Sequence, residues 1–347
     1  MADAVTAFAP GRVNLIGEHT DYNQGLALPF AISEGVTVTA WPGQAGTVEV
    51  YAVDLDAHDH FALDGPEPAR GWRAFARGAV AELSAAGASL TGARLRITGS
   101  VPRGSGLSSS AALEGALCLA LLAIARAQVP EPIALAKICS RVENEWVGAR
   151  TGLLDQIASL CGRPDHALEI DFQTLSVTPV ALALRDHTLV TLDSGQSHVN
   201  AGGEPGAEGY NRRREECAQA CAALEIDSLR AATPADVARL PAPLDARARH
   251  VITENQRVRE TVEALARGDL VAVGRLLDAS HASLRDDFAI STPAVEATVE
   301  RLRDAGAIGA RIVGGGFGGH VLGLLPPGAE PPPQAVVVTP GPGAHLL

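Results

Sequence analysis

A glycine- and serine-rich turn, residues 102–111, contains the residue types that could hold phosphate. Its sequence is Pro-Arg-Gly-Ser-Gly-Leu-Ser-Ser-Ser-Ala, between an alternating run at 93–98 and an alanine- and leucine-rich segment at 111–127. This pattern predicts a strand, a tight loop and a helix. The backbone N–H groups at such a helix start bind anions, most often phosphate. No lysine directly follows the glycines, so the turn is not a Walker loop, and an ordinary helix N-cap at Ser108 is the alternative interpretation.

The segment 9–25 is unusually dense in hydrogen-bonding side chains. They are Arg12, Asn14, Glu18, His19, Thr20, Asp21, Tyr22 and Asn23. Such a segment suits a ligand that carries many hydroxyl groups, because carboxylates and imidazoles can bond to neighbouring hydroxyls. A solvated loop with turn residues at 23–25 is the alternative.

Two acidic residues could complete a catalytic cleft. Glu143 lies in a predicted helix at 133–147, and Asp155 lies at the first turn of a short apolar helix, after a close turn that Gly152 permits. A helix dipole favours an acid at this position. Asp155 is therefore either a helix-start charge or a carboxylate directed into the same cleft as the serine turn.

Residues 309–325 form a predicted strand, a glycine-rich turn and a second strand. Several glycines in one turn indicate backbone that needs positive φ or a group that packs directly against it. A hairpin turn and a wall of a nucleotide cleft both meet this description.

The elements that must position these residues alternate between strands and helices. We expect strands at 4–9, 36–41, 47–53 and 93–98, helices at 72–86, 111–127, 133–147, 246–267, 270–285 and 294–305, and a glycine-rich loop at 193–209 before a helix that begins at Tyr210. The helix at 111–127 is apolar nearly all round and should be buried. The pattern predicts an α+β protein of two domains with a cleft between them.

Composition excludes several classes of protein. The 347 residues are 46% hydrophobic and 20% charged, which is typical of a globular protein with a sizeable core. A net charge of -12 argues against a nucleic-acid partner. No apolar run is long enough to span a bilayer, and no signal peptide is visible. The five cysteines are scattered, so we expect free thiols and a cytoplasmic location.

Three separated motifs resemble those of the galactokinase family. Residues 11–25 look like its sugar signature, 102–111 resemble the second motif of the wider GHMP kinase superfamily, and 314–319 resemble its third. Shorter matches at 152–156, 210–213, 283–288 and 291–293 extend the resemblance over nearly the whole chain. The third motif departs from the usual pattern at Ile312, Val313 and His320.

The resemblance implies a two-domain GHMP kinase fold. It implies a ribosomal-S5-domain-2-like domain at 1–182, a ferredoxin-like domain at 183–347 and an active site at their interface. It also implies ATP- and Mg²⁺-dependent phosphorylation of galactose at C1, by a monomeric protein. A kinase for N-acetylgalactosamine or arabinose, and a non-catalytic sensor of galactose and ATP, are the alternatives.

The resemblance also implies a role for each candidate residue. Asp155 would be the base and Arg12 its catalytic partner, while Ser110 and Glu143 would bind Mg²⁺. The sugar would contact Glu18, His19, Thr20, Asp21, Gly152 and Tyr210. The triphosphate would contact Gly104, Ser105, Gly106, Leu107, Ser108, Ser109 and Ser110.

Overall fold

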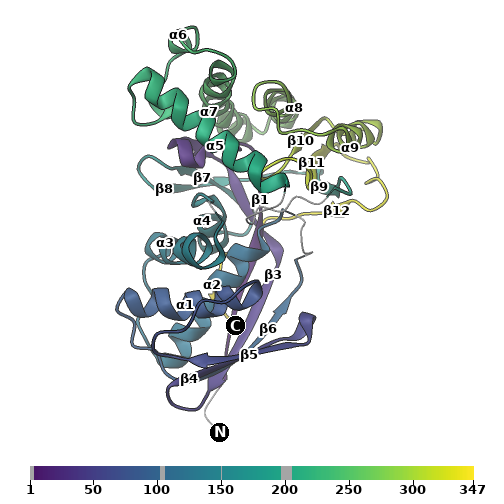
Figure 1. The fold of residues 1–347 in the computed structure, drawn as a ribbon. Coiled ribbons are helices and arrows are strands. Elements are labelled where there is room, and N and C mark those ends of the chain that lie inside the picture. Colours follow the sequence, from purple (N-terminus) through teal and green to yellow (C-terminus); the bar gives the residue numbers. More distant parts are fainter. Residues whose placement is uncertain (1–3, 102–105, 150, 197–204) are drawn as a thin grey trace.

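The computed structural model describes residues 4–101, 106–149, 151–196 and 205–347. A six-stranded sheet forms the lower part of the molecule in Figure 1. The strands in spatial order are β13 (His345–Leu346), β1 (Val5–Asn14), β3 (Pro29–Pro42), β6 (Ala93–Gly99), β4 (Thr47–Ala52) and β5 (Ala57–Ala62). Strands β4 and β6 are parallel, and the other neighbours are antiparallel. The sheet thus includes the last strand of the chain beside the first.

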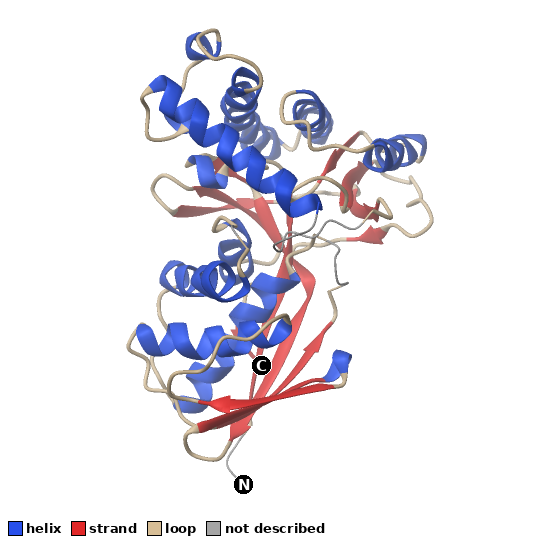
Figure 2. Cartoon of the chain, viewed as in Figure 1, coloured by secondary structure: helices blue, strands red, loops and turns tan. Residues whose placement is uncertain are grey.

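Helices cover one face of this sheet (Figure 2). They are α1 (Trp72–Ala85), α2 (Ser109–Ala125), α3 (Pro132–Arg141), the π-helical turn η3 (Val142–Val147) and α4 (Leu154–Cys161). Along β6 the buried Ala93, Leu95 and Ile97 alternate with the exposed Arg94 and Arg96, as expected for a sheet with one solvated face.

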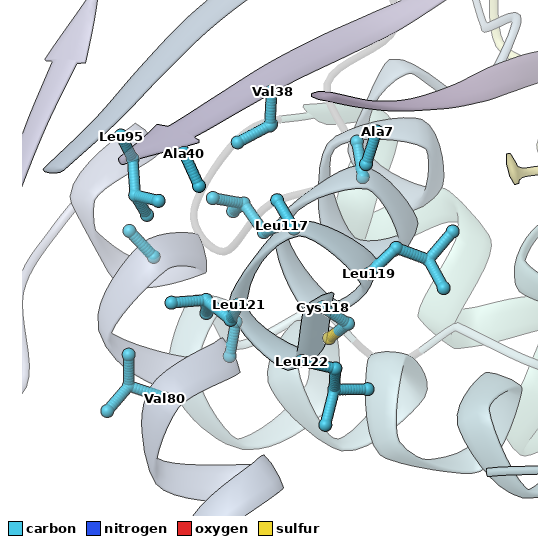
Figure 3. Close-up of a cluster of buried hydrophobic side chains, with 14 of the residues drawn as sticks. Ala7, Val38, Ala40, Val80, Leu95, Leu117, Cys118, Leu119, Leu121 and Leu122 are labelled. Carbon is cyan, nitrogen blue, oxygen red and sulfur yellow. The ribbon is translucent and has the colours of Figure 1, made fainter. Parts of the chain in front are cut away.

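Helix α2 forms the centre of the lower core, as its apolar sequence predicts. Figure 3 shows Leu117 of this helix next to Val38 and Ala40 of β3, and all three belong to one buried cluster. Leu117 and Val38 are completely buried. The helix start that carries the serine turn is therefore fixed to the sheet by the packing of the rest of the helix.

The upper part of the molecule contains two smaller sheets (Figure 1). One has β2 (Leu26–Ala27), β7 (His166–Asp171) and β8 (Ser176–Ala181), and the other has β10 (Gly309–Ile312), β11 (His320–Leu325), β9 (Thr188–Asp193) and β12 (Val336–Val337). The helices are α5 (Pro205–Leu224), α6 (Pro234–Val237), α7 (Leu244–Arg267), α8 (Leu270–Asp286) and α9 (Pro293–Asp304). Short 3₁₀ turns lie at η1 (Asp21–Asn23), η2 (Val53–Leu55) and η4 (Leu229–Ala231).

The predicted α+β class is confirmed, and several element boundaries differ from those expected. The strand expected at 36–41 is β3, which runs from Pro29 to Pro42. Strand β1 continues to Asn14, because Arg12 and Val13 pair with β3 and are buried. The helix expected at 133–147 divides into α3 and η3. Helix α5 begins at Pro205 instead of Tyr210, and residues 197–204 of the expected loop lie outside the described part. The division into domains at residues 182 and 183 stays a prediction.

Across the part of the chain that the structure describes, no helix combines the length and apolar character needed to cross a bilayer.

Candidate active site

Two adjoining cavities lie where the six-stranded sheet, the start of α2 and the glycine-rich hairpin between β10 and β11 meet. The larger is a cleft of about 760 Å³, and the smaller is a pocket of about 50 Å³. The residues that line both are Arg12, Thr151, Asp155, Gly314 and Gly315. A ligand in one cavity therefore meets a ligand in the other at Arg12 and Asp155.

The larger cleft is lined by both apolar and polar side chains. Its apolar wall consists of Val36, Ala52, Leu55, Trp72, Phe75, Ile97, Val101, Leu113 and Val147. Its polar lining includes Ser108, Ser109, Ser110 and Glu143. Such a lining suits a ligand that carries both an apolar group and a charged group.

Asp155 lies in the first turn of α4, as predicted, and accepts bonds on both oxygens. The Arg12 guanidinium donates to Oδ1 through Nε at 2.8 Å, and its Nη2 lies 2.7 Å from the same oxygen. Arg12 Nη1 also donates to the Gly106 carbonyl at 2.6 Å. The Ser108 hydroxyl donates to Asp155 Oδ2. One carboxylate is thus fixed by β1 and by the serine turn.

The described part of the serine turn presents Ser108, Ser109 and Ser110 to the cleft. Helix α2 begins at Ser109, and Ser108 before it has φ 60°. The Ser108 side chain makes no capping bond to the helix, so the simple N-cap interpretation does not describe it. Leu107 is buried, and its carbonyl accepts from the Arg12 amide at 3.0 Å.

Not every residue predicted for the phosphate loop can be placed. Gly104 and Ser105 lie outside the described residues. Gly106 lines the larger cleft, whereas Leu107 does not. Leu107 anchors the turn to the core.

Glu143 and Ser110 fit a magnesium ion. The Glu143 carboxylate is buried and hydrogen bonds with the Ser110 hydroxyl, the Thr151 hydroxyl and the Gln156 amide. Burial, followed by the nearby charge of Asp155, raises the pKa of Glu143, so a cation beside it would relieve an unfavourable charge. Carboxylate and hydroxyl oxygens suit this hard cation, which usually keeps water and phosphate oxygens as its remaining ligands. Among the described residues no group of three or more His, Cys, Asp or Glu could hold a metal.

The smaller pocket collects most of the residues predicted to bind sugar. Glu18, His19, Asp21, Gly152 and Tyr210 line it together with Leu154. Thr20 does not line it. The fully buried Thr20 hydroxyl donates to the carbonyls of Gly17 and Leu26 at 2.9 and 2.8 Å, so Thr20 holds the shape of the segment.

His19 is buried among aromatic rings. Its ring centroid lies 5.3 Å from that of Tyr210 and 4.7 Å from that of Phe288. Nδ1 lies 2.7 Å from the Tyr22 hydroxyl. Burial lowers the pKa of His19 to about 3. The imidazole is therefore neutral near pH 7 and can offer a ligand a neutral hydrogen-bonding group.

Glu18 has strong partners within the protein. Its Oε1 accepts from the Gly314 amide at 2.8 Å and lies 3.3 Å from Arg311 Nη2. Arg311 is completely buried, and its Nη1 donates to the carbonyls of Asn14 and Leu15 at 2.9 and 3.1 Å. Glu18 thus joins the polar segment to the glycine-rich hairpin while it lines the pocket.

The glycine-rich segment is both a hairpin and a cavity wall. It connects the antiparallel strands β10 and β11, and Gly314 and Gly315 line both cavities. A Cβ at Gly314 would lie 3.7 Å from the Gly106 carbonyl, so the hairpin closely approaches the serine turn. Ile312 and Val313, which depart from the expected motif, are buried in the core.

Sequence reasoning missed several residues that hold the site. They are Thr151, Gln156, Arg311, Trp72 and Phe75. Two of them have a local signal. Gln156 directly follows Asp155, and Arg311 is a charged residue inside an otherwise small and apolar strand.

Family models match three parts of the chain. The "Galactokinase galactose-binding signature" matches residues 2–42, "GHMP kinases N terminal domain" matches 74–163 and "GHMP kinases C terminal" matches 261–333. The matched regions contain the polar segment, the serine turn with Asp155, and the glycine-rich hairpin. The fold and the site therefore define the chain as a GHMP kinase.

Similar proteins identify the family within that superfamily. Galactokinase of Mycobacterium tuberculosis is 46% identical over 92% of this chain and 88% of its own length. The Roseiflexus galactokinase is 42% identical over 91% of this chain and 82% of its own length. A crystal structure of Lactococcus lactis galactokinase complexed with galactose has a TM-score of 0.91 and 31% identity, and covers 99% of this chain and 95% of that one. The chain belongs to the galactokinase family.

A more distant structure agrees on the fold alone. Methanococcus jannaschii mevalonate kinase has a TM-score of 0.66 and 18% identity, over 94% of this chain and 91% of its own.

Proposed function

We propose that this protein transfers the γ-phosphoryl group of ATP to the anomeric C1 hydroxyl of D-galactose. The products are ADP and galactose 1-phosphate, in the first step of the Leloir pathway of galactose metabolism. Membership of the galactokinase family supports the proposal. The observation that carries it is that Arg12 and Asp155 line both the large cleft and the small pocket, so they lie where two substrates would meet.

The large cleft is suited to the nucleotide. Its apolar wall, which includes Trp72 and Phe75, would accept the adenine ring, and Ser108, Ser109 and Ser110 would face the phosphates. The N-terminus of α2 adds backbone N–H groups and a favourable dipole for negative charge.

Ser110 and Glu143 would hold Mg²⁺ beside the phosphates. When bound, the ion would neutralise charge on the phosphate oxygens, which is one of the main requirements of phosphoryl transfer.

Asp155 would remove the proton from the C1 hydroxyl. The hydroxyl oxygen then bonds to the γ-phosphorus as the bond from that phosphorus to the β-phosphate oxygen breaks, and ADP leaves. Arg12 and Ser108 hold the two oxygens of Asp155, which fixes the base toward its substrate. The Arg12 guanidinium would also stabilise negative charge on the transferring group.

The small pocket would distinguish galactose from its epimers. Glu18, His19, Asp21 and Tyr210 line it and would bond to sugar hydroxyls. Asp21 would accept from the axial C4 hydroxyl. An epimer that leaves a buried acceptor unpaired loses about 1–3 kcal/mol of binding.

A coupled assay of ADP release with a panel of sugars tests the proposal. We expect turnover with galactose and much weaker turnover with glucose, N-acetylgalactosamine and arabinose. Asp155→Asn should lower kcat by about 10²–10⁴-fold, the usual contribution of a general base, while calorimetry still detects galactose and ATP. Preferred turnover of another sugar would contradict the substrate assignment. Binding of galactose and ATP without ADP release would indicate a sensor.

We further propose a cytoplasmic, monomeric enzyme. The five cysteines are free thiols in the structure, which suits a reducing compartment, and the monomeric state is carried over from the family resemblance.

A further inference from the structure

A fully buried carboxyl group lies behind the proposed metal site and has no part in the chemistry above. Glu114 lies on α2, one helical turn after Ser110, and is completely buried. Its Oε2 accepts from the Gln156 side-chain amide at 3.0 Å, and its Oε1 has no hydrogen-bond partner among the described residues. Burial, followed by the charge of Glu143, raises the pKa of Glu114 well above its usual value. Burying a carboxyl group with one unpaired oxygen costs free energy. The contact between Glu114 and Gln156 therefore needs an explanation.

Gln156 bridges this carboxyl group and Glu143. It is 1% exposed and follows Asp155 on α4. Its Nε2 donates to Glu114 Oε2 at 3.0 Å and to Glu143 Oε2 at 2.7 Å. Both hydrogens of one amide group are thereby directed at two carboxyl groups from different elements, α2 and η3.

The contacts fix one particular oxygen of Glu143. Oε2 accepts from Gln156 and also from the Thr151 hydroxyl at 2.7 Å. Two donors on one oxygen restrict rotation of the carboxylate and occupy that oxygen. Neither Gln156 nor Thr151 occupies Oε1, the oxygen that is then on offer to a cation shared with Ser110.

We propose that Gln156 is a positioning residue that, held by Glu114, orients Glu143 so that Oε1 meets the Mg²⁺ bound with ATP. This inference rests on the proposed function, since it takes MgATP as the ligand of the large cleft. Removing a group that hydrogen bonds to a metal ligand typically lowers metal affinity by 10–100-fold.

The test compares nucleotide binding with and without Mg²⁺. Gln156→Met keeps the length of the side chain and removes both donors. We expect a non-hydrolysable ATP analogue to bind the variant as it binds the unmodified protein when Mg²⁺ is absent. The Mg²⁺ concentration that gives half-maximal enhancement of binding should rise by about tenfold or more. This readout needs no sugar, so it remains informative even if galactose proves not to be the substrate.

Ser159→Ala is the matched control. Ser159 is buried on the same helix, and its hydroxyl donates to the Pro10 carbonyl at 2.7 Å, away from Glu143. This variant should lose stability and keep the Mg²⁺ response of the unmodified protein. If Gln156→Met weakens binding equally with and without Mg²⁺, or keeps the normal Mg²⁺ response, Gln156 is only a buried structural residue.

A second variant keeps the inference testable if Gln156→Met does not fold. Thr151→Val removes the other donor to Glu143 Oε2, from a residue that lines the cleft. The required Mg²⁺ concentration should rise in the same direction as in Gln156→Met. A normal Mg²⁺ response in Thr151→Val would overturn the proposed fixing of Oε2.

Discussion

Asp21 occupies the space in which a side chain at position 152 would begin. A Cβ built on Gly152 would lie 1.7 Å from Asp21 Oδ2 and 2.5 Å from its Cγ. Both residues line the small pocket. Gly152 therefore acts mainly by leaving room for the Asp21 carboxylate.

Gly152→Ala should weaken galactose binding with little effect on the nucleotide. The added methyl group must displace Asp21, so the sugar loses a hydrogen-bond acceptor that costs about 1–3 kcal/mol to leave unpaired. This corresponds to a rise in the galactose Kd of about 5- to 150-fold. Calorimetric titrations with galactose and, separately, with an ATP analogue would measure the two affinities.

A double-mutant cycle separates this explanation from a general folding defect. In the Asp21→Ala background the same Gly152→Ala change should add little further loss, because the displaced carboxylate is already absent. Fully additive losses would mean that Gly152 acts on the sugar site by another route.

The sequence predicted those parts of the site that can be recognised from residues adjacent in the chain. The glycine–serine turn at a helix start, the acid at the first turn of α4 and the crowded polar segment are each readable from neighbouring residues. Resemblance to one family then indicated that they meet, and Arg12, Ser108 and Asp155 do lie in contact.

Contacts between distant segments could not be read in this way. Arg311 lies nearly 300 positions from Asn14 and Leu15, whose carbonyls it binds, and no local pattern encodes that pairing. Thr20 has the same residue type as a sugar ligand, and only its bonds to two carbonyls identify it as structural. The sequence did not predict the extension of β1 to Asn14, because the polar residues there are buried by strand pairing.

Asp21 should destabilise the folded protein near neutral pH. Burial, aided by the charge of Asp155, raises its pKa from 3.8 to about 6. Between these values the folded chain binds more protons than the unfolded chain, so this group's contribution to stability decreases as pH rises and is fully unfavourable above about pH 6. At about 1.4 kcal/mol per pH unit the penalty is about 3 kcal/mol.

Asp21→Asn should therefore raise the free energy of unfolding at pH 7.5 by about 1–3 kcal/mol while it weakens galactose binding. Urea unfolding of both proteins from pH 4 to pH 8 would measure the difference, which should shrink toward zero at the acidic end. A variant that is less stable than the unmodified protein at every pH would contradict the assigned pKa.

Arg311 should be one of the most sensitive positions for stability. Its removal in Arg311→Met leaves the buried Glu18 without its ion-pair partner and two backbone carbonyls without their donor. Breaking a buried pair in this way costs about 3–5 kcal/mol, which the urea midpoint would report. Arg311→Lys should recover only part of the loss, because a single ammonium group cannot reproduce the fork that reaches all three acceptors.

A second substitution on the partner tests the origin of that cost. Adding Glu18→Gln to Arg311→Met removes the uncompensated charge and keeps an acceptor for the Gly314 amide. The double variant should be more stable than Arg311→Met alone. If it is less stable, the loss comes from packing around Arg311 instead of from the isolated charge.

Ser108 offers a way to separate backbone strain from catalysis. Its φ of 60° is a left-handed conformation that favours glycine, and its hydroxyl donates to Asp155. Ser108→Gly and Ser108→Ala both remove the hydroxyl, but only glycine relieves the strain, which is worth about 1–2 kcal/mol. We therefore expect Ser108→Gly to be more stable than Ser108→Ala by about 1 kcal/mol in urea unfolding.

The two variants should nevertheless lose activity together. A hydrogen bond to a charged group contributes about 1.5–3 kcal/mol, so kcat should fall by about 10- to 150-fold in both if the hydroxyl holds Asp155 in place. Steady-state kinetics with saturating galactose and ATP would measure the loss. Near-normal kcat in Ser108→Gly, with a loss confined to Ser108→Ala, would assign the role to the backbone of the serine turn and leave the Ser108 hydroxyl without one.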